Sequence, residues 1–426
     1  MTSRFALLAT LALGLLAGCS SSSSDSSGDL AQAKSSLSRD TSPPTTDVGT
    51  LATDNTKFAV AAYGQLAKAD GNLFFSPYSI SSALAMEYAG AKGQTATDMA
   101  TALSFSLPQD KLHPAFDAID LALDANAATK DDSEGAPLTL QVANSIWAAN
   151  DLTFVPSYLD VLAKDYGAGV YLEDFGNTPK AVKDIDGWVM DKTNDKIDHL
   201  VDGAIDGDTR MVLVNAVYFY GNWAVPFETS DTQDGSFTTA AGGQVTVPMM
   251  HGSSFRYGSV STPDFDAVEL PYVGNAVMDI VMPKAGTLAT FEASLDAGKL
   301  ASTFDLVKSS GGGETNLAIP KFGYKGDVIE LNSLLGALGM GSAFDDGADF
   351  SGISTTESLH IDQVIHKAFL SVDEKGTEAA AATAVTNKDA AIAQQSITID
   401  HPFLFFIRET TTNTVLFAGR ISDPTQ

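Results

Sequence analysis

A run of 22 residues without a proline, Glu374–Gln395, most constrains what this chain can fold into. It lies between two segments with the β-branched and aromatic composition of strands, Ile361–Val372 and Ser396–Ile399. Loops of this length are uncommon in compact domains and are often functional. Alanine, the residue with the highest helix propensity, dominates the run, so one alternative is a plain helical connector.

The other alternative is a segment that enters a sheet as a strand. Alternate side chains of a strand share a face. One face would then carry only small or β-branched uncharged side chains, those of Thr377, Ala379, Ala381, Thr383 and Val385. Glu378 would point the other way, Lys375 precedes the strand, and Gly376 supplies a hinge. A loop that can become a strand is a candidate conformational switch.

The pattern elsewhere predicts one domain of the mixed α+β class. Helical spacing of apolar residues comes early, in Lys57–Ala69, Ile80–Lys92 and Ala181–Leu200, with Ser76 or Ser79 available as an N-cap. Strand-like segments come mostly later: Leu138–Ala148, Met211–Tyr220, Val245–Met250, Phe265–Pro271, Ala276–Met282, Pro402–Arg408 and Thr414–Ile421. This grouping favours α+β over a repeating βαβ barrel. Residues 308–315, which contain three consecutive glycines, are expected to form a surface loop.

Charge and cysteine content exclude several classes of protein. The chain has 53 Asp and Glu against 25 Lys and Arg, a net charge of −28. Such a surface repels phosphate backbones and anionic lipid, so nucleic-acid binding is not expected. Cys19 is the only cysteine, which rules out an internal disulfide and a cysteine-rich metal site.

Common catalytic motifs are absent from the sequence. There is no Gly-x-Ser-x-Gly elbow, His-Glu-x-x-His, phosphate-binding loop or Gly-x-Gly-x-x-Gly. The six histidines are dispersed, and none has the spacing of a metal pair. The acidic run 345–349 lacks the bidentate glutamate of a calcium loop and is expected to be a solvated turn. We therefore expect neither an enzyme nor a bound metal or other cofactor.

The first residues have the pattern of a bacterial lipoprotein signal. Arg4 precedes an apolar run, Phe5–Ala17, which is too short to span a bilayer comfortably. Small residues then allow cleavage before Cys19, whose thiol would accept lipid; an ordinary signal peptide with an incidental cysteine is the alternative. We expect a signal peptide over 1–18, a lipidated Cys19 with a flexible tether over 19–48, and a single domain over 49–426.

A series of short motifs runs through the chain from about residue 55 onward. The strongest block is His366–Ala368 with Val372–Ala380. The others are Asn72–Ile80, Asn215–Trp223 with Pro226 and Phe227, Val247–Met250, Ala348–Ile353, Asp400–Phe403 and Phe417–Arg420. In this order they resemble the serpins, the serine-protease-inhibitor family. The resemblance implies the serpin fold, with helices around a large central sheet, smaller sheets and an exposed reactive-centre loop.

For the run 374–395 the resemblance implies suicide inhibition of a serine protease. The loop acts as bait, the protease forms an acyl-enzyme with it, and the cleaved loop inserts into the sheet as a strand. Distortion of the trapped protease then stops deacylation. The hinge of inhibitory members is matched by Glu374, Gly376, Thr377, Ala379, Ala380, Ala381 and Ala382. Non-inhibitory relatives tend to have charged or bulky residues there.

The family's usual spacing from Glu374 places the reactive bond at Ala390–Ala391. A small bait residue suits proteases with shallow apolar pockets, such as elastase-like or subtilisin-like enzymes. Lys388 would suit a trypsin-like enzyme but lies two residues earlier. The distal side, Ile392–Gln395, is about one residue longer than the family pattern, which leaves the exact bond open.

Further family sites carry over to polar and aromatic residues. Ser76, Ser79, Asn215 and His366 match the shutter, the polar cluster beneath the sheet where its strands part. Taken singly, they would be an N-cap, a strand amide and a core histidine. Trp223 matches the breach, where insertion starts. Heparin-binding members have a basic helix where this chain has Asp117, Asp120 and Asp124, so a polyanionic activator is not expected.

The expected partners are a target serine protease, bound covalently, and a membrane bound through Cys19. The protein is expected to be a monomer in the cell envelope, at the outer membrane of a Gram-negative bacterium or on the cell surface. Two alternatives stay open: a non-inhibitory surface protein of serpin fold whose loop is only a substrate, and an inhibitor of cysteine proteases.

Overall fold

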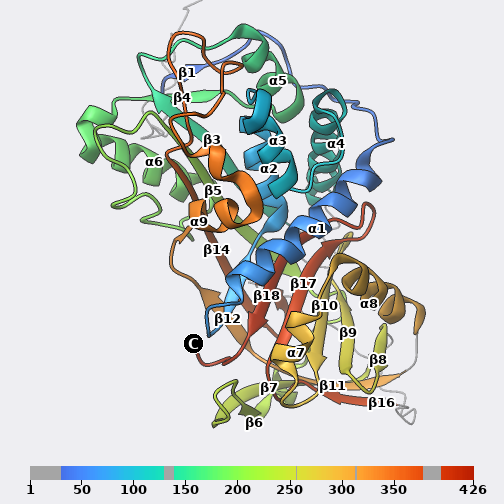
Figure 1. The fold of residues 1–426 in the computed structure, drawn as a ribbon. Coiled ribbons are helices and arrows are strands. Elements are labelled where there is room, and N and C mark those ends of the chain that lie inside the picture. The colour runs from blue at the N-terminus through green and yellow to red at the C-terminus, as the bar shows by residue number, and fades with distance from the viewer. Residues whose placement is uncertain (1–29, 129–138, 256, 312–313, 378–394) are drawn as a thin grey trace, which may run out of the picture. The chain divides into compact units, whose positions relative to one another are not determined.

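The computed structural model describes residues 30–128, 139–255, 257–311, 314–377 and 395–426. Ala31–Gln426 form one compact unit, described here by itself. It consists of three β-sheets with helices packed around them (Figure 1). Within the described ranges, no helix has the length and apolar character needed to cross a membrane.

The largest sheet has eight strands and contains the candidate site. Its order is β1-β4-β3-β5-β15-β14-β12, and β13 also pairs with β14. The bounds are β1 Gln32–Ala33, β3 Thr139–Ala149, β4 Val170–Glu173, β5 Met211–Asn222, β12 Phe322–Lys325, β13 Ile329–Glu330, β14 Gln363–Asp373 and β15 Gly376–Thr377. Two strands far apart in the sequence, β5 and β14, run parallel at its centre, with Asn215 opposite His366.

Two smaller sheets complete the β structure. The six-stranded sheet has the order β2-β18-β17-β10-β9-β8, and the four-stranded sheet has the order β16-β11-β7-β6. Their bounds are β2 Leu73–Phe75, β6 Gln233–Thr238, β7 Gln244–Phe255, β8 Ser259–Ser261, β9 Phe265–Pro271, β10 Ala276–Pro283, β11 Thr315–Pro320, β16 Gln395–Thr398, β17 Phe403–Glu409 and β18 Val415–Ile421. β10, β17 and β18 are buried along their whole length, which accounts for their nearly unbroken apolar sequences.

Six of the helices precede residue 193. The bounds are α1 Val48–Leu66, α2 Pro77–Tyr88, α3 Gly93–Ala102, α4 Gln109–Ala128, α5 Pro156–Tyr166, α6 Thr178–Lys192, α7 Leu288–Ala293, α8 Ala297–Ser309 and α9 Asn332–Leu335. Ser76 caps α2, since its hydroxyl accepts a hydrogen bond from the amide of Ser79, and Pro77 occupies the first turn. This cap orients the buried helix α2 beneath the large sheet.

The prediction of an α+β fold is confirmed, with some local differences. Most expected strands lie within a few residues of their predicted ends, and β9 has the predicted bounds. Two of the three expected helices differ more, because α1 begins nine residues before Lys57 and α6 ends eight residues before Leu200. The predicted loop at 308–315 begins with the last turn of α8, a helix that was not among the expected ones. The sequence does contain a helix signal for α8, since its buried residues Leu300, Thr303, Phe304 and Val307 have the spacing i, i+3, i+4, i+7 and Asp296 is its N-cap.

Residues 31–47 differ from the expected flexible tether over 19–48. β1 pairs antiparallel with β4 at the edge of the large sheet, and the amide of Asp40 donates to the carbonyl of Lys164 on α5. The segment needs no core of its own, because the edge strand offers free backbone groups. The compact unit therefore begins at Ala31 rather than Gly49. The predicted signal peptide and Cys19 lie outside the described residues.

Candidate functional site

The large sheet is parted at one end of its two central strands. β5 and β14 pair directly from Val212 opposite Gln363 to Tyr218 opposite Phe369. Beyond that point β15 lies between them, antiparallel to both, with Thr377 opposite Gly221 on β5 and opposite Val372 on β14. The first residues of the predicted reactive loop thus already occupy the start of an additional strand.

Close backbone contacts hold β15 in this gap. Gly376 has φ +151°, and a Cβ atom there would lie 2.0 Å from the carbonyl oxygen of Gly221, so only glycine fits. Thr377 is fully buried, and its hydroxyl lies 2.8 Å from that of Tyr272. Thr377 belongs to the strand face that was predicted to point inward, and its side chain is buried in the structure.

Trp223 anchors the chain that leads into the gap. Its indole nitrogen donates to the carbonyl of Asp373 (3.0 Å), and its amide donates to the carbonyl of Lys375 (2.8 Å). Its ring stacks on Tyr272 at 4.5 Å between centroids. Because Tyr272 also contacts Thr377, the two aromatic residues couple the end of β14 to the start of β15.

Glu374, between β14 and β15, is buried and paired. Its carboxylate oxygens lie 2.6 Å from Nζ of Lys321 and 2.7 Å from the hydroxyl of Thr232. Burial alone would raise the pKa of Glu374, but the hydrogen bonds from Lys321 and Thr232 outweigh it and lower the pKa. The carboxylate is therefore charged at neutral pH and ties the loop entrance to two other segments.

A buried polar cluster lies further along the paired part of β5 and β14. The side chains of Ser76, Ser79, Asn215 and His366 meet there, joined by Asn144 on β3. Nδ1 of His366 donates to the side-chain carbonyl of Asn215, while Nε2 accepts from the amide of Ser76 at 3.3 Å. This pattern requires the neutral imidazole with its proton on Nδ1.

Burial keeps this imidazole neutral. His366 is fully buried, and burial lowers its pKa from 6.5 to about 3. Its partner Asn215 is directly opposite on β5, so the hydrogen bond between them bridges the two strands. Any strand that entered between β5 and β14 would have to replace this bridge.

Comparison with known proteins identifies the family. The serpin (serine protease inhibitor) family model matches residues 53–424. The chain belongs to the serpin family. It is 38% identical to a serpin-like protein of Thermococcus kodakarensis over 86% of this chain and 84% of the relative. It is 36% identical to leukocyte elastase inhibitor A of Mus musculus over 88% and 99% of the two chains.

By their titles, the solved structures similar to this serpin include a serine protease inhibitor of Manduca sexta and a thyroxine-binding globulin. One is human thyroxine-binding globulin complexed with thyroxine, at 30% identity and a TM-score of 0.78, covering 89% of this chain and all of that one. The serpin fold is therefore established for this chain. Membership of the family is consistent with inhibition of proteases rather than catalysis, and the family also contains proteins that bind other ligands.

The structure brings together most of the site residues predicted for this serpin. Ser76, Ser79, Asn215 and His366 form one hydrogen-bonded cluster. Trp223 donates to the carbonyls of Asp373 and Lys375, which flank Glu374 and lead to Gly376 and Thr377. Ala379, Ala380, Ala381, Ala382, Ala390 and Ala391 lie outside the described residues.

Four residues that form hydrogen bonds or an ion pair in this site were not predicted from the sequence. They are Thr232, Tyr272, Lys321 and Asn144. Lys321 and Thr232 are ordinary surface residue types whose partner lies far away in the sequence. For Asn144 the signal was weak, because β3 contains other polar residues, namely Thr139, Gln141 and Ser145.

One side-chain group among the described residues could offer three ligand atoms to a metal ion, that of Asp186, His199 and Asp202. Asp186 accepts hydrogen bonds from the amides of Leu200 and Val201, and Nδ1 of His199 lies 2.8 Å from Asp202. These contacts fold the loop after α6, and the exposed histidine and Asp202 need no metal to explain them.

Proposed function

We propose that this serpin inhibits serine proteases by loop cleavage and insertion of the cleaved loop between β5 and β14. The observation that carries the proposal is β15, since Gly376 and Thr377 already form the first pairs of that strand. The similarity to leukocyte elastase inhibitor A supports it, and so does the hinge, which is free of bulky charged residues from Gly376 to Thr377.

The register of β15 predicts where the rest of the loop would dock. Thr383 lies six residues beyond Thr377, which pairs with Gly221 on β5 and Val372 on β14. Because the strands are antiparallel, the expected partners of Thr383 lie six residues before these two, at Asn215 and His366. These two residues are themselves opposite each other in the native pairing, so both edges of the gap give the same register. The hydroxyl of Thr383 would then take over a hydrogen bond that now joins the two strands.

The chemistry follows the protease's own first half-reaction. Its serine oxygen would attack the carbonyl carbon of Ala390, the bond to the nitrogen of Ala391 would break, and the new amino terminus would leave with a proton. Residues 377–390 at about 3.3 Å each span roughly 46 Å, so insertion would carry the acylated protease far from the loop's starting position. Displacement of the catalytic groups would then prevent attack by water on the ester.

A protease panel tests this function. Purified protein is mixed with elastase, subtilisin, trypsin and a papain-type cysteine protease, and denaturing gels and mass spectrometry follow the products. A covalent complex with elastase or subtilisin, cut after Ala390, is expected. A complex with trypsin, cut after Lys388, would relocate the reactive bond. If the loop is cleaved and the protease keeps its full activity, the non-inhibitory alternative is supported, in which the loop is only a substrate.

Anchoring of this serpin to the cell envelope through Cys19 is part of the proposal. The sequence Leu16-Ala17-Gly18-Cys19 supports it, and residues 20–30 would be the tether to the compact unit. Two acyl chains would give stable anchoring. Metabolic labelling of the wild type with a fatty acid, abolished by Cys19→Ala, is the expected result; a wild-type protein that takes up no label would point to an ordinary signal peptide.

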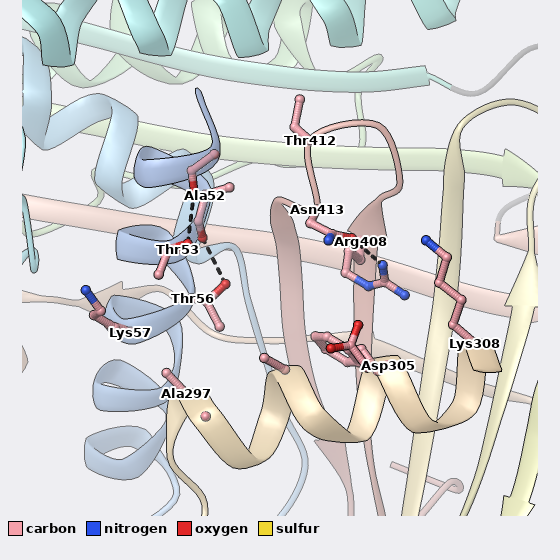
Figure 2. A pocket seen from close by; sticks show the side chains of 14 residues that line it. Ala52, Thr53, Thr56, Lys57, Ala297, Asp305, Lys308, Arg408, Thr412 and Asn413 are labelled. Atoms are coloured by element: carbon pink, nitrogen blue, oxygen red, sulfur yellow. Dashed lines mark hydrogen bonds between the residues drawn. The ribbon is translucent and has the colours of Figure 1, made fainter. Parts of the chain in front are cut away.

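A second candidate function is suggested by a cavity of about 500 Å³ between α1, α8 and the turn after β17 (Figure 2). Thr53, Phe304 and Asn413 line it, and its wall is mainly apolar. Because the similar globulin is thyroxine-binding by its title, we test the cavity with thyroxine as a probe. Saturable binding that is lost in Ala301→Phe, which fills the cavity, would support a carrier role; no binding would remove it.

A further inference from the structure

The segment 31–47, which enters the compact unit from the predicted tether, makes contacts with three elements in succession. The carbonyl of Ala31 accepts from the amide of Leu172, next to the β1–β4 pairing. The hydroxyl of Ser35 donates to Asp160 on α5 (2.5 Å). Further on, Nε of Arg39 lies 2.6 Å from Asp117 on α4. We call residues 31–47 the strap.

Arg39 neutralises an acidic face of α4. Asp117, Asp120 and Asp124 follow helical spacing and so lie on one side of the helix. The guanidinium lies 2.6, 3.4 and 3.9 Å from their carboxylates. Asp117 is completely buried, and like charges at this spacing repel. Without Arg39, these carboxylates would lose the one cation that is ion-paired with all three among the described residues, and Asp117 would keep only the weaker influence of Lys164.

The strap packs closely against the residues that connect α5 and β4. Gly167 ends α5 in the left-handed conformation, with φ +61°, and Arg39 Cδ lies 3.0 Å from where a Cβ would be. At Gly169 a Cβ would lie 2.8 Å from the carbonyl oxygen of Ala33 and 2.6 Å from Lys34 Cγ. Both glycines therefore leave room for the strap, which makes it a packed part of the domain.

The contacts of Arg39 continue to the helix beneath the gap. Asp120 accepts a hydrogen bond from the hydroxyl of Tyr78 on α2, at 2.5 Å. The start of α2 lies across the parting line, since Ser76 contacts His366 on β14 while Ser79 contacts Asn215 on β5 and Asn144 on β3. The strap, Asp120 and Tyr78 thus link β4 to a helix that is bound to both sides of the line.

Insertion of one strand must widen the sheet by about 4.8 Å between β5 and β14. The block β1-β4-β3-β5 would have to move relative to β14 and to α2. We infer that the strap is a latch: Arg39 holds α4 and β4 to α2, and so slows the opening of the sheet that loop insertion requires. The inference rests on the proposed insertion between β5 and β14 but not on any particular protease.

The latch is tested by the rate at which the sheet accepts a synthetic peptide with the sequence of residues 377–388, a reaction that needs opening but no protease. Arg39→Gln removes the cation, and Gly169→Ala displaces the strap without altering any charge. Lys34→Gln is the matched control, because it removes one cation from the same strap but none of the ion pairs with α4. Exchange of the Leu172 amide, measured in parallel, reports release of β1.

We expect uptake about tenfold faster in Arg39→Gln and Gly169→Ala, the change that loss of a charge-assisted hydrogen bond produces. Lys34→Gln should match the wild type. Equal rates in all four proteins, or faster Leu172 exchange without faster uptake, would overturn the latch. The peptide assay and the protease panel separate the two proposals. If the variants take up peptide faster but the protein forms no covalent complex with any protease, the latch is supported and the inhibitor function is not.

Discussion

The hydroxyl of Tyr272, which follows β9, lies 2.8 Å from that of Thr377, the second of the two loop residues that already pair in the large sheet. Tyr272 also stacks on Trp223, whose indole holds the carbonyl of Asp373 at the end of β14. The start of the additional strand is therefore fixed by a small set of contacts, while the paired part of β5 and β14 still blocks its continuation.

Thr377→Arg should convert the inhibitor into a substrate. Thr377 is fully buried, and an arginine there would place a charge with no partner in the interior, which costs several kcal/mol. The moles of serpin consumed per protease inhibited should rise about tenfold or more. Thr377→Ser keeps the hydroxyl and is the control. Equal stoichiometry for the arginine and serine variants would contradict insertion through this gap.

Glu374→Gln should loosen the loop entrance. The substitution removes the charge that Lys321 and Thr232 bind, and hydrogen bonds to charged groups contribute about 1.5–3 kcal/mol. We expect a lower midpoint of thermal unfolding and a similar decrease for Lys321→Gln. In the double variant the decrease should be smaller than the sum of the two. If the decrease in the double variant equals the sum of the decreases in the two single variants, the interaction between Glu374 and Lys321 makes no contribution to thermal stability.

Acid should destabilise the native state through His366. The pKa is about 3 in the folded protein and 6.5 unfolded, so the stabilisation is complete above pH 6.5 and is lost as the pH falls toward 3. At pH 5 this one group accounts for about 2 kcal/mol, which His366→Gln should remove from the pH dependence measured by urea unfolding. His113, whose pKa is lowered by burial to about 4, should leave a residual slope in the variant. An unchanged slope would contradict the neutral, buried imidazole.

Glu87→Gln should stabilise the protein at alkaline pH. The carboxyl is fully buried, and neither oxygen has a hydrogen-bond partner within the described residues. Burial raises its pKa from 4.5 to about 8, so the folded state is favoured below pH 4.5 and loses stability as the pH rises toward 8. At pH 7.5 the neutral isostere should gain about 4 kcal/mol, with little effect at pH 4.5. A gain of equal size at both pH values would point to packing instead.

The sequence predicted the class of fold because the strand patterns of β9, β10 and β18 are local. The shutter depended on the family resemblance, since Ser76 and His366 are 290 residues apart and neither is unusual in its own segment. The pairing of Glu374 with Lys321 had no sequence signal, because it arises from the pairing of β12 with β14, which are distant in the sequence.

The strap was missed for a different physical reason. Its composition cannot form a core, which is the usual mark of a flexible linker. Its order comes from groups supplied by the domain, namely the free edge of β4 and the acids of α4 around Arg39. Those acids were interpreted only as evidence against a polyanionic activator, although they also require a cation from within the chain.

The most direct test of the account is a crystal structure of the protein after cleavage of its loop. We predict that residues from Thr377 onward form a strand between β5 and β14, with Thr383 between Asn215 and His366 and the direct pairing of the two strands gone. A cleaved protein in which β5 and β14 remain paired from Val212–Gln363 to Tyr218–Phe369, with the loop outside the sheet, would contradict it.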